Sequence, residues 1–177
     1  MGFKFTPHKH RRTTLFFLNR SAFSNWHFLK FIKFINENIA LTLAVARRRN
    51  IDNLNEYARF EFRFFNDLKR SIARQYKREP KNTAMTVQYG GRGAINMSCS
   101  KTVELRFFGG ALTESHYKAK IDYVQAVFEY SYNSSLKSQN VMEFKRFVMK
   151  NKNRFRHLVK QFQFPVYERA FQFPHHT

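Results

Sequence analysis

Apolar runs divide the first fifty residues into one strand and two helices. The Phe-rich run over residues 13–19 has the length of a strand and predicts a buried one. Over residues 25–36 apolar side chains recur every three to four positions, which predicts a helix capped by Ser24. A second helix is predicted over residues 39–48. It ends on Arg47-Arg48-Arg49, cations that either balance the helix dipole or contact an acidic partner.

The middle of the chain changes from a helical to an alternating pattern. Residues 66–79 have the spacing of an amphipathic helix with a basic outer face, and Pro80 ends it. Short strands are then predicted over residues 83–89, 94–97 and 102–107, with turns between them.

Alternation in the third of these strands separates two kinds of side chain. Its period of two places Val103, Leu105 and Phe107 on one face, and Glu104 and Arg106 on the other. The apolar face is therefore expected to be covered.

Helices are predicted for most of the remaining chain. Gly109-Gly110 ends the third strand, and Thr113 then caps a long helix that reaches about residue 133 and is expected to cover the sheet. Further helical segments are predicted over residues 141–149 and 154–162. The expected fold class is α+β, a small antiparallel sheet backed by several helices.

The chain repeats one tetrapeptide near its end. Phe-Gln-Phe-Pro occupies residues 162–165 and again residues 171–174. Phe at alternate positions before Pro favours extended backbone. An extended C-terminal tail over residues 163–177 is therefore expected to follow a single domain over residues 13–162, and to dock on that domain or on a partner, with its own domain preferred. A basic N-terminal arm is predicted over residues 1–12.

Composition supports one folded domain that does not span a membrane. The chain has 177 residues with 43% hydrophobic content, which suffices for a core. Lys and Arg interrupt every apolar stretch, so neither a spanning helix nor a signal peptide is expected. Cys99 is the single cysteine, which excludes an intrachain disulfide and a cysteine-cluster zinc site. A reducing interior such as the cytoplasm is the expected compartment.

The charge indicates an acidic partner. There are 32 Lys and Arg against 12 Asp and Glu, a net charge of +20. A chain this basic repels itself unless it contacts an anion, and nucleic acid or a nucleoprotein complex is the expected partner. An anionic membrane surface is the second possibility, but the basic residues are spread along the chain. The candidate nucleic-acid-binding residues are Arg47, Arg48, Arg49, Lys69, Arg70, Arg74, Lys77, Arg78, Lys145, Arg146, Lys150, Lys152, Arg154, Arg156 and Lys160.

Several stretches, read in order, resemble one enzyme family. The most specific covers residues 102–113, a Glu-x-Arg strand followed by Gly, a small residue, Leu and a helix, with Arg92 and Asn96 ahead of it. These residues resemble the amidoligases of phages and bacteria, relatives of the carboxylate-amine ligase and glutamine synthetase superfamily. The similarity extends over most of the chain.

The resemblance implies a fold and a reaction. The fold would be a curved antiparallel sheet backed by helices, in which ATP phosphorylates a carboxylate before an amine attacks it. Glu104 would be a magnesium ligand, while Arg106, Arg92 and Arg48 would contact phosphate or the substrate carboxylate. Asn96 stands where the family has its Asn.

The chain departs from the family at the positions that would bind the metal. The family's His-x-His is here Leu15 and Phe17, no Asp or Glu precedes Glu37, and the upstream acidic strand pair has no counterpart. A single carboxylate would hold magnesium weakly. No catalysis, cofactor or metal is therefore expected, and Glu104 and Arg106 are expected to form an ion pair retained from an ancestor.

The sequence thus predicts a catalytically inactive, N-terminally truncated amidoligase-like protein that binds nucleic acid or a nucleoprotein complex. The resemblance suggests a phage or mobile-element protein with an anti-defence or virion-associated role, located in the host-cell interior or within a virion. One alternative is an active carboxylate-amine ligase that uses ATP and Mg. The other is a structural component of a large nucleoprotein assembly.

Overall fold

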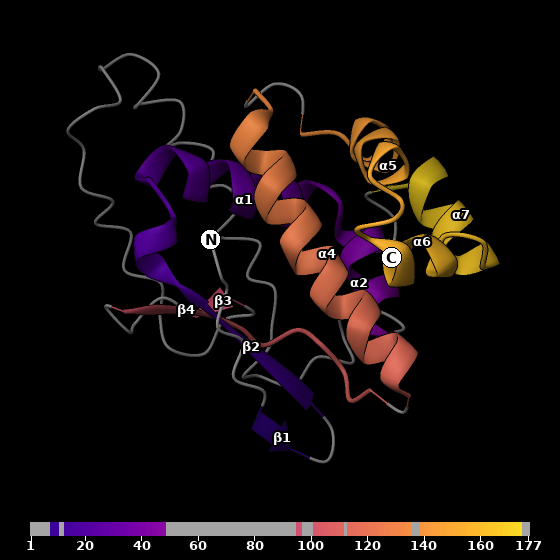
Figure 1. Cartoon of the computed structure of the whole chain (residues 1–177), viewed down its shortest axis with the longest axis horizontal. Helices are drawn as coiled ribbons and strands as arrows, with labels where there is room; N and C mark the ends of the chain where they lie inside the picture. Colours follow the sequence, from indigo (N-terminus) through magenta and orange to yellow (C-terminus); the bar gives the residue numbers. More distant parts are fainter. Residues whose placement is uncertain are drawn as a thin grey trace.

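The computed structural model describes residues 8–10, 13–48, 95–96, 101–111, 113–135 and 139–174 (Figure 1). It combines a small antiparallel sheet with mostly helical structure, which confirms the mixed α+β class. The helix predicted over residues 66–79 and the strand predicted over residues 83–89 lie outside the described residues.

Four short strands form the sheet in the order β1-β2-β4-β3, and every neighbouring pair is antiparallel. The strands are β1 (His8–His10), β2 (Thr13–Asn19), β3 (Ile95–Asn96) and β4 (Thr102–Leu105). The predicted strand over residues 13–19 is confirmed. Part of the predicted N-terminal arm is strand β1, because its three residues pair with the start of β2.

The register of β2 against β4 explains which face of the sheet is buried. Phe16 lies opposite Leu105 and Leu18 opposite Val103, and all four side chains are buried. Antiparallel partners share a face, so these residues form one apolar surface that the helices cover. The predicted alternation is confirmed, since Phe107 is also buried and lies just beyond the strand.

Two consecutive helices follow β2 and a single 3-10 turn (Arg20–Ala22). Helix α1 (Asn25–Glu37) begins where the Ser24 side chain accepts a hydrogen bond from the backbone N–H of His27, as predicted. Helix α2 (Ile39–Ala46) ends at Arg47, which adopts the left-handed conformation with φ of 58°.

Helix α4 (Glu114–Asn133) is the longest described helix and crosses in front of α1 and α2 in Figure 1. The Thr113 side chain accepts a hydrogen bond from the backbone of His116, so the predicted cap is confirmed. The apolar side of α4 includes Val124 and Val127, both fully buried.

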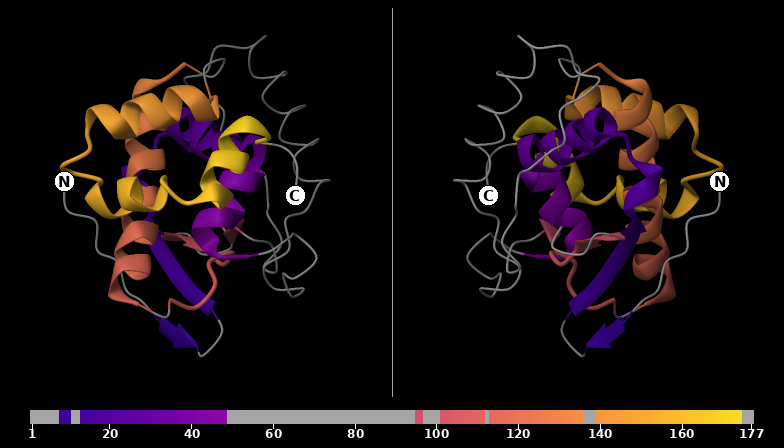
Figure 2. Two further views of the ribbon diagram at one scale, coloured as in Figure 1. Left: turned by 90° about the vertical axis from the view of Figure 1, so that its right-hand side faces the viewer. Right: turned by 90° about the vertical axis from the view of Figure 1, so that its left-hand side faces the viewer.

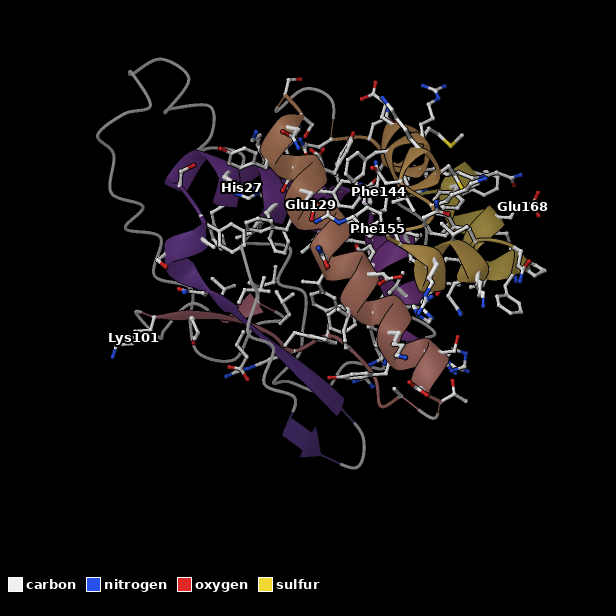
Figure 3. The ribbon with its side chains drawn as sticks, viewed as in Figure 1. His27, Lys101, Glu129, Phe144, Phe155 and Glu168 are labelled. Atoms are coloured by element: carbon white, nitrogen blue, oxygen red, sulfur yellow. The ribbon has the colours of Figure 1, made fainter. Side chains whose placement is uncertain are left out.

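Three short helices complete the described chain, and they lie together at the right of Figure 1. They are α5 (Val141–Lys150), α6 (Arg156–Gln161) and α7 (Pro165–Gln172). Asp122 of α4 accepts hydrogen bonds from the backbone N–H groups of His157 and Leu158, so a side chain of α4 caps the start of α6. Phe144 and Phe155 are fully buried where these helices meet α4 (Figure 3).

The prediction of an extended tail over residues 163–177 is wrong, because residues 165–172 form helix α7. Proline fits the first position of a helix, where its missing N–H is not needed, and Pro165 occupies that position. The repeat brackets the helix: Phe164 is extended before the first proline, and the helix ends before Pro174. The expectation that this segment docks on its own domain is confirmed, since Tyr167 is buried and its hydroxyl donates to the carbonyl of Ala44.

Buried polar groups join α1 to the C-terminal end of α4. His27 is 2% exposed, and its Nε2 lies 2.7 Å from the carbonyl oxygen of Phe128 and 3.2 Å from Ser131 Oγ. Lys30 donates to the carbonyls of Tyr132 and Ser134, both at 2.8 Å. A cation suits carbonyl groups at a helix C-terminus.

Among the described helices, none is long and apolar enough to cross a membrane.

Candidate functional site

Glu104 of β4 forms an ion pair with Arg106, which directly follows the strand. Arg106 Nη2 lies 2.7 Å from Glu104 Oε2, and both side chains are mostly buried, at 18% and 13% exposure. The carboxylate charge is therefore balanced by the side chain of a residue just beyond the strand that carries it.

The sheet places the other family positions across from this carboxylate. Phe17 of β2 and Asn96 of β3 are the Cα partners of Glu104 on its two sides. Phe17 thus stands beside the position that the resemblance assigns to a metal ligand. Arg92 lies outside the described residues. Among the residues that the structure describes, no three His, Cys, Asp or Glu side chains converge on a metal-sized site.

Arg48 lies at the end of α2, where its Nε donates to the carbonyl oxygen of Phe107 at 3.3 Å. Burial lowers the pKa of its guanidinium. The contact fixes Arg48 against the chain just after β4.

Gly109 brings the end of α2 against this same segment. Its N–H donates to the carbonyl of Ala46 at 2.8 Å, and a Cβ at this position would lie 2.9 Å from that oxygen and 3.6 Å from Arg48 Nε. Only glycine allows so close an approach without a backbone shift. The sequence signal for this contact is Gly109-Gly110, which by its pattern predicts the end of a strand and no contact with α2.

A fully buried lysine completes the contact. Lys120 of α4 donates from Nζ to the carbonyl oxygen of Gly109 at 2.5 Å. Burial, together with repulsion from Arg47 and Arg48, lowers the pKa of Lys120 to about 8. These contacts place three cationic side chains close together around one turn of backbone.

His116 adds a fourth basic group. Arg47 Nη1 contacts Nδ1 of the His116 ring and lies 3.3 Å from its Nε2. Desolvation lowers the pKa of His116, as do the nearby charges of Arg47 and Lys120. These effects favour the neutral imidazole, which can accept a hydrogen bond from the guanidinium.

The basic groups border a hollow of about 780 Å³ between α2 and α7. We call it the α2–α7 hollow, and its lining comes from residues 40–48, His116 and residues 161–173. Its basic side chains are Arg47, Arg48, His116 and Arg169, and no Asp or Glu is among its described lining residues. Helices α2 and α7, which border it, lie next to each other in the left view of Figure 2.

A second basic surface covers α5, α6 and the turn between them. We call it the α5–α6 basic face. Its seven cations are Lys145, Arg146, Lys150, Lys152, Arg154, Arg156 and Lys160, and six of them are exposed while Lys145 is half-buried.

Helical spacing groups these cations on outward faces. Arg146 and Lys150 are four residues apart on α5, as are Arg156 and Lys160 on α6, so each pair lies on one side of its helix. Their opposite sides carry buried residues such as Phe144 and Leu158.

Acidic groups neutralise little of the α5–α6 basic face. Within the described part of the chain, Arg154 is its only member with a salt bridge, 2.5 Å from Glu129 Oε1. Lys145 lies over the ring of Phe171 at 4.5 Å. The remaining charges face solvent, where their fields add.

The other predicted nucleic-acid-binding residues lie outside the described part of the chain. They are Arg49, Lys69, Arg70, Arg74, Lys77 and Arg78.

Sequence reasoning missed several residues that line the α2–α7 hollow. His116, Gln161 and Arg169 are far from Arg47 in the sequence, and they fall in segments predicted as helices or as the tail. Helical periodicity places Arg169 one turn after Pro165, but only if α7 is first recognised as a helix.

Comparison with protein-family models, with curated proteins and with solved structures gives no significant match for this chain.

Proposed function

We propose that this protein binds nucleic acid, alone or within a nucleoprotein complex, and does so without catalysis on an α+β scaffold that resembles the amidoligases. The observation that carries the proposal is the α5–α6 basic face, where seven cations have one salt bridge among them in the described structure. Such a surface has uncompensated charge at the spacing of a helix turn, which suits a phosphate backbone.

The state of Glu104 supports binding over ligase chemistry. A ligase of the proposed ancestral kind needs carboxylates free to hold magnesium beside ATP. Here Arg106 neutralises Glu104 at 2.7 Å, and the neighbouring strand position is Phe17 in place of a histidine. These features favour a scaffold without the enzyme's metal chemistry.

Salt dependence of binding tests the proposal. If four of the seven cations face phosphates, the slope of log affinity against log salt is about −3 to −4, and affinity falls about a hundredfold between about 50 and about 200 mM salt. Fluorescence anisotropy with labelled oligonucleotides measures this slope. Affinity that does not change over this range would rule the proposal out.

A matched pair of charge variants separates the basic face from net charge. Lys152→Gln removes one charge from the α5–α6 basic face, whereas Lys101→Gln removes one at the distant end of the sheet (Figure 3). We expect Lys152→Gln to weaken binding and to lower the salt slope by about one, and Lys101→Gln to change neither. Equal effects would mean that binding follows overall charge and not this face.

The alternative, an ATP- and magnesium-dependent ligase, has one supporting observation. The sheet aligns Asn96 with Glu104, two positions that match the motif of the family in the resemblance. ADP release in the presence of magnesium and mixed amino acids, compared with Arg106→Ala, tests it. Turnover that depends on Arg106 would replace the binding proposal.

A further inference from the structure

The α2–α7 hollow combines basic and aromatic side chains on one open surface. Phe164, Val166 and Phe173 line it and are 46%, 47% and 54% exposed. They are three of the six large hydrophobic side chains that are exposed in the described structure. Exposed aromatic rings beside cations are typical of surfaces that stack nucleic-acid bases.

The carbonyl groups that end α2 do not oppose an anion in this hollow. The carbonyl of Ala44 accepts from the backbone N–H of Arg47 and from the Tyr167 hydroxyl, and the carbonyl of Leu43 accepts from the N–H of Arg48. Because these oxygens are already satisfied, the negative end of the helix is largely screened.

The basic side chains retain donors for a ligand. The side chain of Arg47 contacts neutral His116 and no carboxylate in the described residues. Arg169 is exposed, and its guanidinium has neither a hydrogen bond nor a salt bridge within that part of the chain. A guanidinium offers five N–H donors, so both residues can bind phosphate oxygens.

Gln161 supplies a group that can read a base edge. The residue is 7% exposed and lines the hollow, and its side-chain amide makes no hydrogen bond to any described residue. The amide nitrogen and oxygen are not sealed inside the protein, so both are accessible to a ligand in the hollow. The donor and acceptor of the amide match the hydrogen-bonding edge of a nucleobase.

We propose that the α2–α7 hollow binds one nucleotide of a single-stranded nucleic acid. Arg47 and Arg169 contact the phosphate, the base stacks against Phe164 and Phe173, and Gln161 bonds to the base edge. A hollow of about 780 Å³ is of the size that holds small ligands. This inference rests on the proposed function and narrows it to unpaired strands, since a stacked base must leave the duplex. A free mononucleotide carries the same chemistry, and the experiment separates the two sources.

The test measures affinity of the full-length protein for four probes. These are a ten-nucleotide single strand, the same strand with abasic sites, a duplex of equal length, and a nucleoside monophosphate. We expect the intact strand to bind about tenfold more tightly than the abasic strand at the same salt. Equal affinity for the two strands would remove the stacking role and overturn the inference.

Two variants and two matched controls assign the effect to the hollow. Arg169→Gln and Phe164→Leu should each weaken binding of the intact strand about fivefold to tenfold, and Phe164→Leu should leave the abasic strand unchanged. Lys101→Gln and Tyr132→Leu, which remove an exposed charge and an exposed aromatic elsewhere, should leave all affinities unchanged. Circular dichroism confirms that each variant is folded.

The outcomes separate the hollow from the basic face. Variants of the hollow that behave like their controls, while Lys152→Gln still weakens binding, would overturn the hollow and leave the proposed function standing. Loss of binding to every strand and duplex would overturn the proposed function itself. A monophosphate that binds through Arg169 while no oligonucleotide does would assign the hollow to free nucleotides and refute its role with strands. If an acidic aromatic peptide displaces the single strand as effectively as unlabelled strand does, the hollow is a protein-docking site and the inference is overturned.

Discussion

Lowering the pH from about 8 to about 5 should destabilise this protein through His27, and the variant His27→Gln isolates that effect. The imidazole lies between α1 and α4 with Phe23, Phe128 and Tyr132 around it, at ring-centroid distances of 5.0, 4.3 and 5.1 Å. A carbonyl oxygen can only accept, so Nε2 carries the hydrogen that is donated to Phe128. Nδ1 is buried and has no hydrogen-bond partner in the described residues, so a second proton would have no acceptor there.

The size of the effect follows from the pKa of His27. Burial lowers it from 6.5 to about 4, an effect partly opposed by the hydrogen bond to Phe128 and increased by nearby Lys30. As the pH falls below about 6.5 the unfolded chain binds the proton first, so the free energy of unfolding decreases. The full loss is about 3 kcal/mol below about pH 4, and about 2 kcal/mol of it has occurred by about pH 5.

Urea denaturation followed by circular dichroism measures this loss. Urea is uncharged, so raising its concentration adds no ionic screening. The repulsion within a chain of net charge +20 is therefore screened equally at every urea concentration. The native protein and His27→Gln share all other titrating groups, so the contributions of those groups cancel in the difference between the two free energies of unfolding. We expect this difference to change by about 2 kcal/mol between about pH 8 and about pH 5, in the direction that favours the variant at low pH.

Two results would refute the reasoning about His27. One is a difference between the two proteins that stays constant, within about 0.5 kcal/mol, across that pH range. The other is a nitrogen NMR spectrum that shows a doubly protonated His27 ring in the folded protein at about pH 6, where we expect a neutral ring protonated at Nε2.

Three further predictions concern the contacts that hold the helices in place. Gly109→Ala should lower the free energy of unfolding by about 1–3 kcal/mol, because its Cβ would lie 2.9 Å from the carbonyl oxygen of Ala46; thermal melting that matches the native protein would contradict this. Lys120 has a pKa of about 8 in the folded state against 10.5 in the unfolded chain, so the folded state binds fewer protons between these pH values. The free energy of unfolding should therefore rise between about pH 8 and about pH 10, and urea titrations of Lys120→Met should lack that rise. The side chain of Asn140 accepts hydrogen bonds from two backbone N–H groups at the start of α5, so Asn140→Ala should lower the free energy of unfolding by about 1 kcal/mol. In the same urea assay, Asn140→Asp should retain most of the native stability.

Local chemistry made most of the described elements predictable from sequence. Ser24 and Thr113 cap α1 and α4 as expected, because a side-chain oxygen at that position satisfies a backbone N–H that the helix cannot. The strand over residues 13–19 was predictable from its length and apolar content. Such signals depend only on neighbours in the chain.

Helix α7 shows where local signals conflict. Proline disfavours helix in the residue before it and favours helix in the residues that follow, so Phe164-Pro165 is compatible with an extended tail or with a helix start. Packing decides the outcome, since Tyr167, Ala170 and Phe171 are buried only when they lie on one helical side.

The α2–α7 hollow could not be predicted for a different reason. Its basic residues come from the end of α2, the start of α4 and the middle of α7, so no spacing in the sequence relates them. The Arg47-Arg48 pair was recognised as a candidate for anion binding, but its partners His116 and Arg169 depend on the tertiary fold. The ion pair of Glu104 with Arg106 was expected, because residues two apart in a strand point to the same side.

The pairing of β2 with β4 has a consequence for how the chain folds during synthesis. Strand β2 leaves the ribosome well before its partner Thr102–Leu105 is synthesised. The edge of β2 that pairs with β4 therefore stays unpaired until then. Helices α4, α5 and α6 are close in sequence and can assemble soon after they appear. An unpaired Phe-rich edge favours association with other nascent chains, so expression at low temperature or with a chaperone should increase recovery of folded protein.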